Sequence, residues 1–170
     1  MAFRRGFKSQ CERRSVEIRK SLNLTTVCPL SAFDLAQHFD VTVWSTEDVH
    51  GLTTDDHLCL STEDDDCWSA LTLRIESDHL VIYKSGQSDA RVNSVVMHEL
   101  SHIILGHELA DAVLLSDGSL VPSNFSQDQE DEADWLGGTL LLPRPALLKI
   151  VQDQTADAIA QRHYGVSTEM

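Results

Sequence analysis

The sequence predicts an α+β fold, in which a small, mostly antiparallel sheet packs against a helix carrying HELSH and against neighbouring helices. Three observations predict it: helical spacing of apolar residues near the N-terminus, short β-favouring runs in the middle, and helical spacing again from about residue 90. The 170 residues, 42% of them hydrophobic, suit one domain, expected at residues 1–150. Residues 151–170 are expected to form a helical appendage.

Two helices are expected before the sheet. The first covers residues 4–22, where one apolar stripe is formed by Phe7, Cys11, Ile18 and Leu22. The second is short and lies within residues 30–40, because Ser31 and Asp34 have the spacing of a capping box.

The middle of the chain contains four short runs that favour β-structure. They are residues 41–44, 57–61, 69–75 and 79–84. In the third run, Leu71, Leu73 and Ile75 alternate with polar residues, which is typical of a strand with one buried face.

Two more helices are expected after the sheet. The first covers residues 90–106, with a core-facing side made of Val92, Val95, Val96, Leu100, Ile103 and Ile104. Residues 117–124 are expected to be a loop. The second helix starts near Ser126, which has capping-box spacing to Gln129, and it ends at Pro143.

The net charge of −14 is unevenly distributed. Residues 1–20 carry seven Lys or Arg and two Asp or Glu, whereas the remaining 150 residues carry six and twenty-five. An acidic body repels a phosphate backbone, so we expect no direct nucleic-acid binding, although a basic protein partner would be attracted.

No apolar run approaches the ~18 residues of a membrane span, and the basic N-terminus lacks the apolar segment of a secretory signal. The four cysteines form no CxxC pair and are expected to be reduced thiols. We therefore expect a cytoplasmic protein without membrane contact.

The HELSH stretch places two imidazoles on one helix face. His98 and His102 are four residues apart, so both can bind one metal ion. Glu99 then lies beside the metal, where a carboxylate can accept a proton from the attacking water, as in zinc peptidases.

A third ligand is expected on the following helix, because a catalytic zinc usually has three protein ligands. Asp128 and Asp131 are explained by the helix dipole alone. Glu130 and Asp134 share an inward face, where an acid needs a partner. We expect Glu130 to be the third ligand and Asp134 to orient a ligand histidine, whereas Glu132 should face solvent.

Two residues remain candidates for contact with the substrate or the transition state. His107 is a rival third ligand, but it lies only five residues after His102, so we expect it to cap the helix or to line the cleft. Tyr83 lies on the last strand before the HELSH helix and would reach the site if that strand borders the cleft. An ordinary half-buried tyrosine is the alternative.

The segments HELSHIILGH and EDEADWLGGTLLLP resemble the ImmA/IrrE family of metallopeptidases, and the resemblance covers roughly residues 5–150. The family pattern on the second helix is E-x-x-A-[ND]-x-F-A-x-x-L-L-[ML]-P. The matching positions are Glu130, Ala133, Asp134, Leu140, Leu141 and Pro143. The chain departs from the pattern at Leu136 and Gly137, where Phe and Ala are usual.

The resemblance implies an endopeptidase with a gluzincin-like site that holds one Zn²⁺ per chain, although such ligands also admit other first-row divalent metals. It further implies a protein substrate, namely a helix-turn-helix repressor of phage-repressor type, whose cleavage induces the repressed genes. The alternative is a metal-containing binding module that captures a repressor or antitoxin without cutting it.

The C-terminal DAIAQRHYGVSTEM resembles the first helix and turn of a helix-turn-helix motif. The helix that would read DNA is missing, so this segment is not expected to bind DNA. It is either the start of a truncated motif or a helical appendage.

Overall fold

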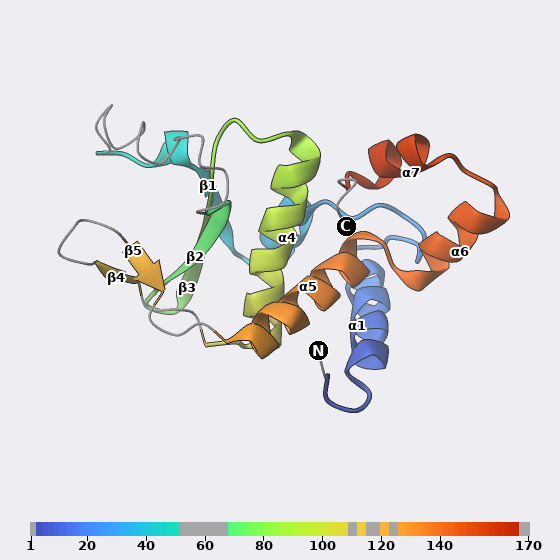
Figure 1. The fold of residues 1–170 in the computed structure, drawn as a ribbon, viewed down its shortest axis with the longest axis horizontal. Coiled ribbons are helices and arrows are strands. Elements are labelled where there is room, and N and C mark those ends of the chain that lie inside the picture. The colour runs from blue at the N-terminus through green and yellow to red at the C-terminus, as the bar shows by residue number, and fades with distance from the viewer. Residues whose placement is uncertain (1–2, 52–67, 109–111, 115–119, 123–125, 167–170) are drawn as a thin grey trace.

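The central element of the fold is a helix that lies between a small sheet and a second long helix (Figure 1). The structure, a computed structural model, describes residues 3–51, 68–108, 112–114, 120–122 and 126–166. The helices are α1 (Phe7–Ser21), α2 (Ala32–His38), α4 (Asp89–Leu105), α5 (Gln127–Leu141), α6 (Arg144–Gln152) and α7 (Asp157–Tyr164), with a 3₁₀ turn at Thr46–Asp48. The strands are β1 (Thr42–Ser45), β2 (Ala70–Ile75), β3 (Asp78–Tyr83), β4 (Ala112–Leu114) and β5 (Leu120–Pro122).

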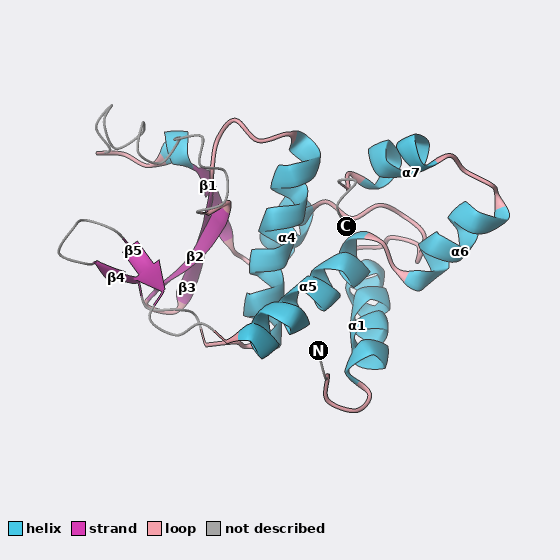
Figure 2. Ribbon diagram, in the orientation of Figure 1, coloured by secondary structure: helices cyan, strands magenta, loops and turns pink. Residues whose placement is uncertain are grey.

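The strands of the main sheet are drawn in magenta in Figure 2, and their order is β1–β3–β2. β2 pairs antiparallel with β3, and β1 pairs parallel with β3, so the sheet is mixed. A second ladder joins β4 and β5 in antiparallel fashion. Two of the three described pairings are therefore antiparallel, and the predicted α+β class is confirmed. The strand expected at residues 57–61 lies outside the described residues.

Helix α4 packs against β2 and β3 on one side, against α5 on the other, and also against α2. Its apolar stripe is as predicted: Val92, Val96 and Leu100 are buried, and the other apolar residues of the stripe pack against the core. Ser88 begins the helix by accepting a hydrogen bond from the Arg91 amide. Gly106 ends it in the left-handed conformation, with φ of 70°.

The sequence placed the long helices well and their caps less well. Ser31 does cap α2, since its side chain accepts from the Phe33 amide, but no reciprocal bond from the Ser31 amide to the Asp34 carboxylate is found. Ser126 stands at the start of α5 without a side-chain capping bond. Within the expected loop at residues 117–124, the strand β5 pairs with β4, which was not predicted. Three-residue strands are too short for polarity to alternate recognisably.

Helix α5 is anchored at its C-terminal end by α1. Arg19 of α1 is fully buried and donates to the carbonyl of Leu140 at 2.6 Å and to the Ser15 hydroxyl at 2.7 Å. Ser15 in turn donates to the carbonyl of Thr139 at 3.0 Å. The last carbonyls of α5, which have no partner within the helix, are satisfied in this way.

The C-terminal segment contributes to the core. Tyr164 and Val166 are buried, and the Tyr164 hydroxyl donates to the carbonyl of Val27 at 2.9 Å. The boundary expected after residue 150 falls within α6, and Gly165 provides the turn after α7 in the left-handed conformation. None of the described helices combines the length and the apolar character that a membrane span requires.

Candidate metal centre

Three side chains converge between α4 and α5. The Nε2 atoms of His98 and His102 lie 3.0 Å apart, and Oε2 of Glu130 lies 3.2 Å from the first and 3.6 Å from the second. A tetrahedral zinc ion with ligands at its usual distance separates those ligands by about 3.3 Å. The three atoms are thus already at the spacing of metal ligands, and they form the one such group among the described residues.

Two adjacent imidazole nitrogens without an ion can share at most one proton. His98 and His102 point the same nitrogen at the same point, which a divalent cation between them would satisfy in both rings at once. The donor set of two imidazoles and one carboxylate fits zinc and also other first-row divalent metals.

His98 is oriented from behind by Asp134. The Nδ1 atom of His98 lies 2.8 Å from Oδ1 of Asp134, although the Asp134 side chain is 70% exposed. If His98 binds a metal through Nε2, its proton must sit on Nδ1 and be donated to this carboxylate. The structure thus brings Asp134 together with His98.

His102 has a different support, which the sequence did not predict. Its Nδ1 atom lies 3.0 Å from Nδ1 of His107, and Nε2 of His107 lies 3.3 Å from Oε2 of Glu132. The expectation that Glu132 faces solvent is therefore wrong, because its side chain is only 23% exposed and is turned toward His107. The position of Glu132 on α5 gives no sign of this contact, because His107 belongs to the chain that follows α4.

The electrostatics of the cluster favour positive charge. Burial opposes a charge on His98, but the carboxylates of Asp134 and Glu130 outweigh it and raise the pKa of His98 to about 10. The neighbouring imidazoles of His102 and His98 hold the pKa of Glu130 well below its usual range. By contrast, burial lowers the pKa of His107, which favours its neutral form.

Glu99 lies on the sheet side of α4. Its Oε2 atom accepts a hydrogen bond of 2.5 Å from the hydroxyl of Thr72 on β2. This contact holds the carboxylate of Glu99 in place. Thr72 was missed because a threonine in an alternating strand reads as an ordinary β-former.

A small residue stands where α5 crosses α4. A methyl group added at Gly137 would lie 3.4 Å from the Ser101 hydroxyl and 3.6 Å from Cα of His98, which is ordinary contact. Ala133 and Leu136 beside it are fully buried. The crossing point fixes the distance between the helix that carries the histidines and the helix that carries Glu130.

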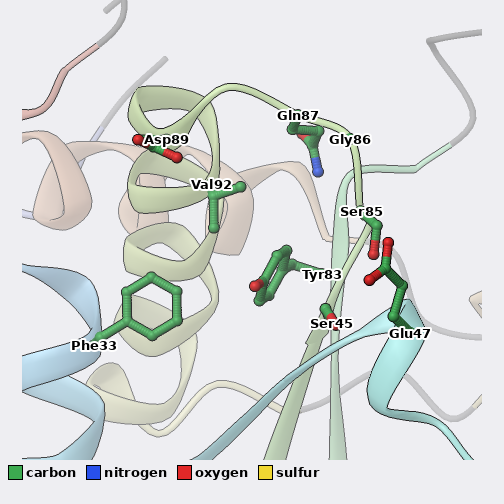
Figure 3. A pocket seen from close by; sticks show the side chains of 9 residues that line it. All are labelled: Phe33, Ser45, Glu47, Tyr83, Ser85, Gly86, Gln87, Asp89 and Val92. Carbon is green, nitrogen blue, oxygen red and sulfur yellow. The ribbon is translucent and has the colours of Figure 1, made fainter.

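Tyr83 lies apart from this cluster, in a cavity of about 370 Å³ at the N-terminal end of α4 (Figure 3). Its ring projects between β3 and α4 and packs edge-on against Phe33, with the ring centres 6.1 Å apart. Val92 and Glu47 also line the cavity. The structure therefore does not bring Tyr83 together with His98, His102 and Glu130.

A HELSH helix with converging imidazoles, an adjacent glutamate and a carboxylate from the next helix defines a site of metallopeptidase type. The comparison with known families agrees. The model of the IrrE N-terminal-like domain, a peptidase family, matches residues 45–170, and the chain belongs to this family.

The fold is also similar to that of a Mycobacterium tuberculosis transcriptional regulator, with a TM-score of 0.50 and 11% sequence identity. The match covers 98% of this chain and 45% of that protein, so this chain spans less than half of the regulator's length. At this identity the likeness concerns the fold alone. No curated protein matches the sequence.

Proposed function

We propose that the protein is a metal-dependent endopeptidase, with Zn²⁺ as the expected ion, that cleaves a helix-turn-helix repressor and so induces the genes it represses. The observation that carries this proposal is the convergence of His98, His102 and Glu130 at ligand spacing, with Glu99 one residue along the same helix. Membership of a peptidase family supports it.

In this proposal each protein group has one task. A bound divalent cation supplies Lewis acidity, which polarises the peptide carbonyl and makes a water molecule more acidic. Glu99 accepts the proton of the attacking water on its carboxylate and passes it to the leaving amine. Thr72 holds that carboxylate through the hydroxyl bond of 2.5 Å, while Asp134 keeps the His98 ring in position.

Charge and family membership support this substrate class. The acidic body of the chain would attract a basic protein electrostatically, and DNA-binding repressors are basic on the face that meets DNA. Tyr83 remains a proposed substrate contact, through the cavity that it shares with Phe33.

The test uses Glu99→Gln, which removes the base but keeps the side-chain shape. In lysate of the source cell, tagged Glu99→Gln should retain a repressor-like protein, and the wild type should cut that purified protein at one site. The matched control is Glu108→Gln, because Glu108 is exposed just after α4, and its loss should leave cutting unchanged.

Loss of a general base costs about 10²- to 10⁴-fold in rate, so Glu99→Gln should be inactive while it still binds one metal ion. Full cleavage by Glu99→Gln would contradict the enzyme proposal. Capture without cutting by the metal-loaded wild type would instead indicate the binding module.

A further inference from the structure

The two histidines of the candidate centre each contact a further side chain through Nδ1, and these two side chains differ in their exposure to solvent. Asp134 behind His98 is 70% exposed, whereas the His107 side chain behind His102 is only 7% exposed. A buried imidazole with both nitrogens in hydrogen-bond range is costly to desolvate unless both bonds are made. Both nitrogens of His107 must therefore make their hydrogen bonds.

The positions of the protons on His102 and His107 follow from one condition, which rests on the proposed metal site: His102 binds the ion. If His102 offers Nε2 to the ion, its proton is on Nδ1 and can be donated to Nδ1 of His107, 3.0 Å away. His107 must then be neutral and carry its own proton on Nε2. That proton is donated to Oε2 of Glu132, 3.3 Å away.

All three groups are satisfied in that arrangement, and no other neutral arrangement of the two rings achieves this. If His107 carried its proton on Nδ1, two protons would face each other across 3.0 Å, or His102 would lose its proton from Nδ1 and carry it on the nitrogen needed for the metal. The carboxylate of Glu132 favours the productive form, because it accepts only from a protonated Nε2.

We propose that His107 and Glu132 are positioning residues for His102: together they select its metal-binding tautomer and hold its ring toward Glu130. The N-terminus takes part at the outer end, since Arg4 lies 3.9 Å from the other carboxylate oxygen of Glu132. Neither residue contacts the ion or the substrate in this role.

A purely structural role for His107 is the competing explanation. Its backbone amide already donates to the His102 carbonyl at 3.0 Å, as part of the end of α4. In that case the imidazole would only fill space, and any side chain of similar size would serve equally well.

The experiment measures the affinity of the full chain for Zn²⁺ by competition with a chromophoric chelator. His107→Phe keeps an aromatic ring at this position but removes both hydrogen bonds, and it should weaken Zn²⁺ binding about 10- to 100-fold, as is usual when the partner of a ligand histidine is lost. Glu132→Gln keeps the shape and should weaken binding less, by about 3- to 10-fold. Glu108→Gln is the control and should bind like the wild type.

A second readout separates positioning from folding. The absorption spectrum of the Co²⁺-loaded protein reports ligand geometry, and it should change in His107→Phe, whereas unfolding of the metal-free chain should change little. Unchanged Zn²⁺ affinity in a folded His107→Phe overturns the proposal. If that variant does not fold, Glu132→Gln decides, because wild-type affinity there also overturns it.

The same titration distinguishes this proposal from the metal site on which it rests. His102→Ala should abolish tight Zn²⁺ binding if the proposed centre is correct. Wild-type affinity in His102→Ala would refute the centre itself. If His102→Ala loses tight binding while the variants of His107 and Glu132 keep it, the positioning role alone is refuted.

Discussion

The two halves of α4 both carry polar side chains, but the hydrogen-bond partners of these side chains differ between the halves. In the N-terminal half, Asn93 accepts from the Ala32 amide at 2.8 Å and donates to the Gly165 carbonyl at 3.0 Å. In the C-terminal half, the ring nitrogens of His98 and His102 face other titratable side chains only.

The difference separates a structural polar residue from a functional cluster. Asn93 joins α2, α4 and the end of α7 through backbone groups that need a partner in any case. The histidines and Glu130 point their polar atoms at one another, so these atoms do not serve as hydrogen-bond partners of the backbone. Such an arrangement is explained by an ion, because a ligand set gathers donors at a point rather than joining chain segments.

The largest expected effect tests the cluster itself. Glu130→Ala should weaken Zn²⁺ binding by more than about 100-fold, because it removes a ligand rather than the support of one. Asp128→Ala is the matched control, since Asp128 is an exposed acid in the same first turn of α5. Chelator competition on both variants makes the measurement, and equal affinities would mean that Glu130 is only a first-turn acid.

The second prediction concerns the structural half of α4. Asn93→Ala should lower the free energy of unfolding by about 1–3 kcal/mol, because an amide and a carbonyl both lose their partner. The Zn²⁺ affinity should remain within about twofold of the wild type. Denaturant unfolding and chelator competition measure the two quantities, with the exposed Gln152→Ala on α6 as control. A parallel loss of metal affinity would show that the two halves do not act separately.

The smallest effect is expected where α4 and α5 cross. Gly137→Ala should leave metal affinity unchanged and raise the free energy of unfolding by up to about 1 kcal/mol, because the methyl group finds ordinary contacts and alanine favours helix. Gly137→Leu should separate the helices and weaken Zn²⁺ binding. Thermal or denaturant unfolding of the alanine variant checks the first part, and a marked loss of stability would mean that the crossing has no room for a methyl group.

Periodicity predicted the long elements of the fold and the side chains that converge between α4 and α5. The 3.6-residue repeat located α1, α4 and α5, and spacings of four residues singled out His98, His102, Glu130 and Asp134, which the structure brings together. These features could be read from the sequence because each depends on contacts within one helix or between two consecutive helices.

Features that depend on tertiary contacts could not be read in the same way. The bond from Thr72 to Glu99 joins a strand to a helix 27 residues later, and nothing in a short window marks it. Glu132 contacts His107 from the adjacent helix, although its position on α5 suggested that its side chain faces solvent. The ladder of β4 and β5 is too short to leave a pattern in the sequence.

The anchoring of α5 by Arg19 and Ser15 has a mechanical consequence. Both bonds hold the helix at Thr139 and Leu140, at the end opposite to Glu130. Near Glu130, α5 is held to α4 and the residues after it by side-chain contacts, among them those of Asp134 with His98 and of Glu132 with His107. An ion bound by His98, His102 and Glu130 would add a further link at this end, so the metal would stiffen the arrangement of helices that its own binding requires.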